Sequence, residues 1–399
     1  MLTVALAQVA FDLTQPFLPL FVRYLGVTDV GEAALWSGLV VGVGPLGAAL
    51  MGPVWGALAD RFGRKAMVLR ALVLISILMI ASAFVPDVRW LMAVRVVMGL
   101  FAGFTAMVMA LAVAISPRER MGQAIGLVQA AQLAPTAIGP TIGGVISDTL
   151  GLRANFILTG LILLVPATLL YFLVQEASYA DAAERPAARP ASKRGSVFSL
   201  FTLPGFAAAL AILFVARFAD RALPPILPLY LLELDTPTAQ LATITGLVVS
   251  SGAVAAAVSS MIYGRRARPD NSRRLLTIAL AGGAACSILL GLVGSWTQVV
   301  VLRLILGLLA GGSMSLAYTM GARLAPAERS GLTLSVLASC AMLGGAASPM
   351  LAGLIGQASL RLVFLANAAA YLMAFALAAL PSLRAARAPD RHRAPEPET

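Results

Sequence analysis

Twelve long apolar stretches run through this chain of 399 residues, and they constrain its fold more than any other feature. A helix of about 20 apolar residues crosses the hydrocarbon core of a bilayer, which is about 30 Å thick. Hydrophobic residues make up 59% of the positions and charged residues only 12%, a far more apolar balance than soluble domains have. The sequence therefore predicts an all-α integral membrane protein with twelve transmembrane helices.

The stretches form two groups of six, with a polar segment between them. We expect the helices near 2–24, 35–58, 67–85, 90–115, 123–147 and 154–174 in the first group, and near 205–232, 240–263, 275–294, 297–322, 331–356 and 361–380 in the second. This predicts a first bundle over 1–174, a linker over 175–203, a second bundle over 204–381 and a tail over 382–399. The tail is rich in Pro and Arg, which predicts disorder.

Most of the 29 Lys and Arg residues fall in loops on one side of this arrangement. Such residues accumulate in cytoplasmic loops, because translocating them across the membrane is unfavourable. We therefore expect a multi-pass protein of the inner (cytoplasmic) membrane, with the linker, the tail and both termini in the cytoplasm. The first stretch begins almost at Met1 without a basic leader, so no signal peptide is expected.

The composition excludes several classes of function. The single histidine, His392, lies in the polar tail, and the two cysteines, Cys286 and Cys340, lie in apolar stretches. A His-based metal or catalytic site is therefore not expected, and no nucleophile cluster suggests an enzyme. The basic residues occupy short gaps, whereas a nucleic-acid partner needs them gathered on one surface. We expect no metal, no cofactor and no nucleic-acid partner.

The two halves of the chain are related by an internal repeat. Superposing them places Asp12 on Asp220, Arg95 on Arg303, Gly99 on Gly307, Pro140 on Pro349 and Gly144 on Gly353. Chance alignment of Ala- and Gly-rich helices explains glycine matches, but it does not explain paired Asp, Arg and Pro. A duplication with six spans in each copy keeps the membrane orientation, so it predicts two parallel bundles with a substrate cavity between them.

A charged motif, GALADRFGRK over 56–65, joins the second and third predicted helices on the basic side. Its key residues are Gly56, Asp60, Arg61, Gly63, Arg64 and Lys65. An acid at the end of a helix is unfavourable for the helix dipole, so Asp60 needs a cation or the N-terminus of another helix as its partner. Gly63 suits the tight turn that follows. The motif predicts a latch for a cytoplasmic gate, and the alternative is an ordinary basic loop.

This string resembles the signature loop of the major facilitator superfamily. The resemblance covers essentially the whole chain and implies the fold of that family, with two pseudo-symmetric six-helix bundles. The matching segment of the second half, GRRARPDNSRR over 264–274, is basic but lacks the acid-arginine-glycine order. A second latch is therefore not expected there.

Two further motifs resemble those of the drug/proton antiporters in this superfamily. The fourth stretch contains RVVMGLFAG, where Arg95 should face a cavity or a partner acid because a charge in the membrane is costly; the resemblance implies that it assists proton transfer. The fifth contains AIGPTIGG, with the packing residues Gly139, Pro140, Gly143 and Gly144. Neighbouring helices can pivot or seal against such a segment. The alternatives are a structural ion pair for Arg95 and a generic kinked helix.

Acids within the spans are the candidate proton carriers. Such an acid holds its proton at neutral pH because its charged form is poorly solvated, and loss of the proton can be coupled to substrate binding. The Asp-x-x-Gln-Pro order of Asp12 and Gln15 resembles the first helix of multidrug/proton antiporters, which makes Asp12 the leading candidate. The alternative is an acid at the membrane interface. Asp220 follows Arg217 by three residues, so it forms either a structural pair or part of the substrate site.

The closest resemblance is to twelve-span multidrug and tetracycline exporters of bacteria. It implies a monomeric secondary transporter that uses the proton gradient to export small amphipathic compounds by alternating access, with the substrate, protons and the lipid bilayer as its partners. The alternative is proton-coupled export or import of a specific metabolite such as a sugar, amino acid or siderophore. A channel is disfavoured because the bundle is duplicated and carries a gate-like loop.

Overall fold

The computed structural model describes residues 2–102, 108, 111, 127–128, 131, 134–173, 201, 205–234, 236–268, 270–324 and 330–379. For residues 53, 56, 60, 64, 134, 323, 330–332, 334 and 335 the structure describes the backbone only. Every secondary-structure element in the described part of the chain is a helix, which confirms the all-α prediction. The predicted tail, and the predicted linker apart from residue 201, lie outside the described residues.

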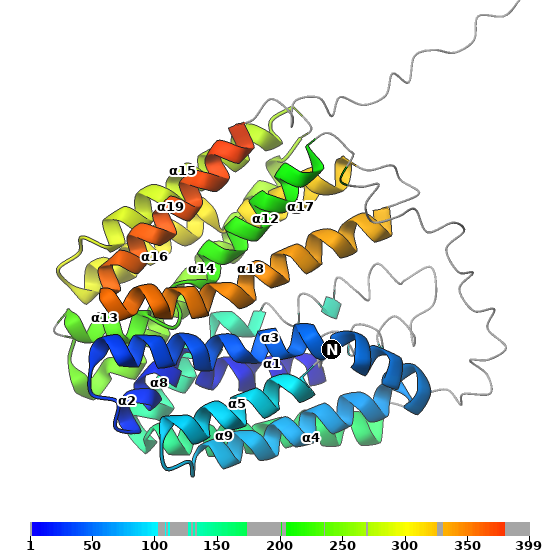
Figure 1. Cartoon of the computed structure of the whole chain (residues 1–399), viewed down its shortest axis with the longest axis vertical. Coiled ribbons are helices and arrows are strands. Elements are labelled where there is room, and N and C mark those ends of the chain that lie inside the picture. The colour runs from blue at the N-terminus through cyan, green and yellow to red at the C-terminus, as the bar shows by residue number, and fades with distance from the viewer. Residues whose placement is uncertain are drawn as a thin grey trace, which may run out of the picture.

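The described helices fall into two groups, which occupy the lower and upper parts of Figure 1. The first group consists of α1 (Leu2–Thr14), η1 (Gln15–Phe17), α2 (Leu18–Tyr24), α3 (Val30–Phe62), α4 (Arg64–Ser82), α5 (Val88–Phe101), η3 (Ala134–Ala137), α8 (Gly139–Leu150) and α9 (Leu152–Leu173). The second consists of α12 (Phe206–Arg221), α13 (Leu227–Glu233), η4 (Thr238–Gln240), α14 (Leu241–Arg266), α15 (Ser272–Leu290), α16 (Trp296–Ala310), α17 (Ser313–Arg323), α18 (Ser330–Ala358) and α19 (Leu360–Ala379).

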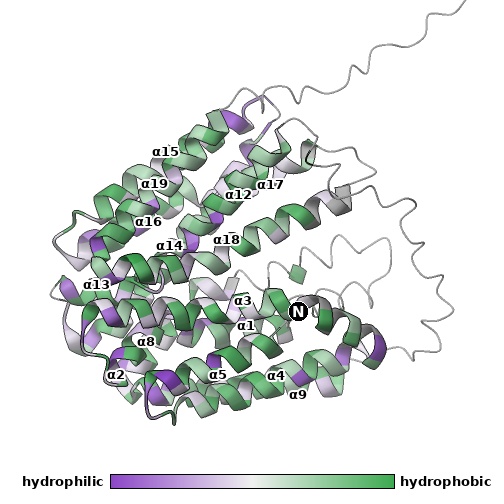
Figure 2. Ribbon diagram, in the orientation of Figure 1, coloured by the Kyte–Doolittle hydropathy of each residue, from purple (hydrophilic) through white to green (hydrophobic). Residues whose placement is uncertain are grey.

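Nine candidate spans in the described residues are long and apolar enough to cross a membrane. Many of their large apolar side chains are exposed, as the surface in contact with lipid requires; in the span Leu152–Leu173, for example, Phe172 is 75% exposed and Leu173 is 72% exposed. Figure 2 shows hydrophobic residues along most of the helices. Described helices also occupy parts of the other three predicted spans: α5 in 90–115, α8 in 123–147, and α12 with α13 in 205–232.

The first span of each group is broken near its middle, where prolines interrupt the helix. α1 ends at Thr14, before the short turn η1, and α12 ends at Arg221, with five residues between it and the start of α13. Pro19 and Pro228 then lie in the first turns of α2 and α13. Proline is tolerated there because its missing N–H has no partner within a helix anyway. Pro19 and Pro228 therefore occupy equivalent positions in the two groups.

Among the described residues, the most extensive contacts between the two bundles are made by two helix pairs, α3 with α18 and α8 with α14. In the first pair, a Cβ added at Gly38 would lie 2.7 Å from the Cα of Gly353 and would also touch the carbonyl of Pro349. Further along α3, a Cβ added at Gly44 or Gly52 would meet no atom within 4 Å. Figure 1 shows that α3 and α18 lie close together where α3 begins and diverge toward its end.

The bundles therefore meet at one end of the molecule and separate toward the other. We call the end where α3 begins the closed end. The opposite end carries the motif of residues 61–65, and we call it the basic end. Gly63 connects α3 to α4 there with a φ of 94°, a conformation that glycine adopts at no steric cost.

Candidate functional site

Asp12 lies near the middle of the first span, less than one turn before the break at η1. Its Oδ1 accepts a hydrogen bond from Nε2 of Gln8 at 3.1 Å. Its Oδ2 is buried and has no hydrogen-bond partner among the described residues. A carboxylate oxygen without a partner is costly away from water, whereas a protonated carboxyl group is much less so. The position therefore suits a group that binds and releases a proton.

The matching acid of the second bundle, Asp220, lies just before the break between α12 and α13. Its Oδ2 lies 3.1 Å from Nη1 of Arg217 and 3.8 Å from Nε of Arg221. The predicted pairing of Arg217 with Asp220 is thus present. Both side chains of the weaker pair are about half exposed, at 53% for Arg221 and 54% for Asp220. Water or a ligand can therefore reach these charges in the middle of the span.

Arg221 links the two acids electrostatically. It lies close enough to Asp12, in the opposite bundle, for their charges to attract each other. Its Nε lies 3.8 Å from Oδ2 of Asp220, which is too far for a hydrogen bond. Arg303 and Tyr371 lie within the same electrostatic range of Asp220. The charged centre therefore belongs mainly to the second bundle, with Asp12 facing it from the first.

Gln15 and Arg95 occupy different surroundings from each other. Gln15 is exposed at the break η1, which contacts α14 of the second bundle, so it lies at the bundle interface. Arg95 is buried, and its guanidinium lies over the ring of Phe156 at 5.8 Å. Its Nε and Nη2 have no hydrogen-bond partner among the described residues. The structure does not place Arg95 next to an acid within those residues, so its role in proton transfer stays a prediction.

The packing motif in α8 brings this helix against both α1 and α14. A Cβ added at Gly139 would lie 2.7 Å from the Cβ of Asp12, and one at Gly143 would touch the carbonyl of Leu13. On the other face, a Cβ at Gly144 would touch the carbonyl of Ala242 in the second bundle. Glycine at these positions lets three backbones approach closely. One side of α8 therefore supports Asp12, and the other side seals against the second bundle.

We expect Gly139→Ala to lower transport several-fold, because the added methyl group displaces Asp12. Overpacking of this kind costs about 1–3 kcal/mol. Gly264→Ala is the matched control, since a Cβ there would meet no atom within 4 Å. Transport by the purified variants in lipid vesicles checks the prediction. Equal activity of the two variants would show that the position of Asp12 does not depend on Gly139.

The motif at the basic end is described only in part. The side chains of Asp60 and Arg64 and the surroundings of Gly56 are not described, so the predicted partner of Asp60 stays a prediction. Arg61 lies over the ring of Phe62, at 5.3 Å from its centroid. Nζ of Lys65 donates a hydrogen bond to the carbonyl of Tyr171 at 2.8 Å. This bond ties the start of α4 to the end of α9 within the first bundle.

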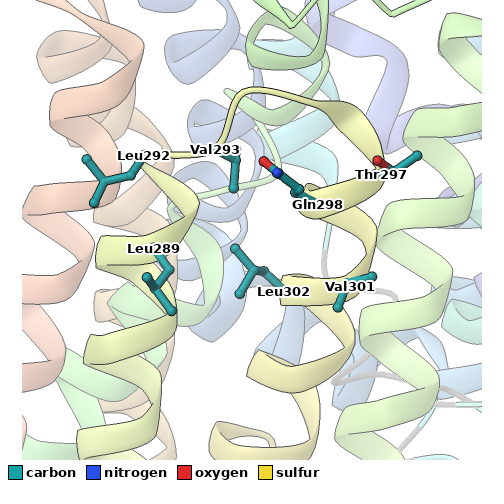
Figure 3. A pocket seen from close by; sticks show the side chains of 7 residues that line it. All are labelled: Leu289, Leu292, Val293, Thr297, Gln298, Val301 and Leu302. Carbon is teal, nitrogen blue, oxygen red and sulfur yellow. The ribbon is translucent and has the colours of Figure 1, made fainter.

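A pocket of about 460 Å³ lies between the end of α15 and the start of α16 (Figure 3). Its lining residues are Leu289, Leu292, Val293, Thr297, Gln298, Val301 and Leu302. None of these seven residues is charged, none belongs to the charged centre, and Leu289 and Leu292 are exposed. The pocket is therefore separate from the charged centre.

Arg221, Arg303 and Tyr371 were not among the residues that the sequence predicted for this site. Arg303 is the repeat copy of Arg95, and Arg221 directly follows Asp220, so both carried a visible signal. Their shared proximity to Asp220 depends on how α12, α16 and α19 pack. That packing is not encoded in any one stretch of the sequence.

Comparison with known proteins agrees with this architecture. A model of the Major Facilitator Superfamily matches residues 1–268 and 209–398. The multidrug resistance efflux pump PmrA of Streptococcus pneumoniae is 32% identical over 364 residues, which cover 91% of this chain and 90% of that protein. The multidrug resistance protein MdtG of Klebsiella pneumoniae is 30% identical over 393 residues, covering 97% and 94% of the two chains.

Solved structures show the same fold at low sequence identity. A bacterial homologue of the human lysosomal transporter Spinster, in an inward-facing and unoccupied conformation, superposes with a TM-score of 0.78. It is 16% identical, and the match covers 96% of this chain and 95% of that one. These matches confirm the predicted fold class. This chain therefore belongs to the major facilitator superfamily, whose members are membrane transporters of small molecules.

Proposed function

We propose that this chain exports small amphipathic compounds in exchange for protons by alternating access. The main support is Asp12, a carboxyl group in the middle of a span with one buried oxygen that has no partner among the described residues. Relatives named as multidrug resistance efflux pumps cover most of the chain and support the direction and the substrate class. No cofactor is needed, because the proton gradient supplies the driving force.

The charges at the bundle interface provide a means of coupling. When Asp12 is ionised it attracts Arg221 of the opposite bundle, and protonation removes this attraction. A proton shifts the balance between two arrangements of the bundles only if its affinity differs between them. The attraction between Asp12 and Arg221 provides such a difference, because its strength depends on how the bundles are arranged. A substrate that binds near these charges competes with the proton, so loading of one favours release of the other.

The orientation follows from the distribution of basic residues. We assign the basic end to the cytoplasm, with both termini there and the protein in the inner membrane. The separation of α3 and α18 toward the basic end then corresponds to an inward-facing state. We further propose that the monomer is the transporting unit, since each chain contains both bundles and the interface between them.

Transport by the purified protein in lipid vesicles tests this function. A panel of cationic, neutral and anionic amphipathic compounds is offered together with sugars, amino acids and a siderophore, with and without an imposed pH gradient. We expect several amphipathic compounds to accumulate against their own concentration gradient when protons flow down their gradient in the opposite direction. Concentrative movement of one metabolite alone would instead support the specific transporter, and purely downhill flux would support a channel.

A further inference from the structure

α8 and α14 belong to different bundles, and neither begins with a side-chain cap of its own. The first N–H groups of a helix have no partner within the helix, and the preceding residue commonly supplies one. Ile138 precedes α8 and Gln240 precedes α14, and neither side chain accepts a hydrogen bond from the helix that follows. The first backbone N–H groups of both helices therefore need partners from elsewhere.

Those partners come from the opposite bundle. The carboxylate of Asp148, near the end of α8, accepts hydrogen bonds from the backbone N–H groups of Ala242 at 3.1 Å and Thr243 at 2.7 Å. In the other direction, the hydroxyl oxygen of Ser250 on α14 accepts one from the N–H of Thr141, in the first turn of α8, at 3.2 Å. Each helix thus caps the other across the bundle interface.

The packing of the two helices makes these bonds possible. Pro140, Gly144 and Asp148 recur at intervals of four, so they lie on one face of α8. A Cβ added at Gly144 would touch the carbonyl of Ala242, and one at Gly246 would touch that of Pro140. The close approach of the two backbones brings the carboxylate within hydrogen-bond distance of the start of α14. Asp148 is therefore the polar residue at the end of the tightly packed α8–α14 interface. We call this interface, and the α3–α18 interface, the two seams between the bundles.

The second seam between the bundles lacks this arrangement in the described residues. There α3 takes the place of α14, and its start is capped by the preceding Asp29, whose side chain accepts a bond from the N–H of Glu32 at 2.7 Å. The repeat position of Asp148 on α18 is Gln357, whose backbone carbonyl lies beside Gly31. The cross-bundle carboxylate is thus a feature of one seam.

We propose that Asp148 is a latch that holds the two bundles together at the closed end, with Ser250 as its weaker counterpart. This inference rests on the proposed alternating access, in which the closed end opens once in each cycle. Opening separates α8 from α14 and leaves the N–H groups of Ala242 and Thr243 without their acceptor. The latch therefore favours the conformation that is shut at this end, and it must be broken before substrate can leave there.

The test measures the width of the closed end directly. Spin labels are attached at Phe84→Cys and Leu292→Cys, two exposed positions at that end in different bundles, after both native cysteines are replaced by alanine. In Asp148→Ala, we expect the fraction of molecules with the longer distance to rise roughly five- to tenfold, as expected for loss of a helix-capping residue. Ser250→Ala should change the distance in the same direction by a smaller factor.

Asp87→Ala is the matched control. Asp87 also accepts two backbone hydrogen bonds, from Arg89 and Trp90, but it caps α5 within its own bundle. We expect no change in the distance there. Unchanged distances in Asp148→Ala, or an equal change in Asp87→Ala, would overturn the latch. No transported compound is used, so absence of proton-driven efflux would overturn the proposed function and leave the distance result to decide the latch.

Discussion

Replacing Asp12 by asparagine is expected to abolish pH-driven accumulation while leaving binding of the transported compound nearly unchanged. Asparagine has the same shape and its oxygen still accepts the hydrogen bond from Gln8, but it neither binds nor releases a proton. No proton then binds at this position, so the pH no longer changes the balance between the two arrangements of the bundles. We expect uphill transport in vesicles to fall roughly tenfold or more, because a ligand with equal affinity for both states shifts neither.

The control for this variant is Asp87→Asn, which removes a carboxyl group of the same kind outside the bundle interface. Asparagine caps a helix about as well as aspartate does, so α5 should keep its start. Binding of the compound to each purified variant is measured beside transport, which separates loss of coupling from loss of fold. If Asp12→Asn still concentrates the compound under a pH gradient, the proton is carried by another group.

The second large effect is expected for Gly38→Ala. A methyl group at this position would collide with the backbone of α18 at Pro349 and Gly353, and a backbone cannot move aside as a flexible side chain does. Overpacking costs about 1–3 kcal/mol, which corresponds to a change of roughly 5- to 150-fold in the balance between two states. The closed end should therefore fail to shut, and transport should fall with it.

Gly44→Ala, in the same helix, is the matched control, because a Cβ at Gly44 would meet no atom within 4 Å. Both variants place the same methyl group on α3, so effects on helix propensity cancel. Transport in vesicles and the spin-label distance between Phe84→Cys and Leu292→Cys report the outcome. A normal distance in Gly38→Ala together with normal transport would mean that α3 and α18 do not need close contact for the cycle.

Local signals in the sequence predicted much of the candidate site. Asp12 and Asp220 were recognisable because acids are rare within apolar spans. The helix breaks that follow them were not predicted, since 2–24 and 205–232 were each expected to form a single helix. The glycines of α8 were identified as a packing face from their spacing. Which helices they touch was not predictable, because one face contacts α1 and the other contacts α14, about one hundred residues further along the chain.

The sequence by itself determined the number and order of the spans, the duplication and the family. The reason is that bilayer thickness and the cost of burying charge act on each stretch separately. Only the tertiary structure decided which groups meet across the interface, namely Asp148 with the start of α14 and Gly38 with the backbone of α18, and it brought Arg221 within electrostatic range of Asp12. These contacts depend on which faces of distant helices pack together, and hydropathy along the chain carries no record of that choice.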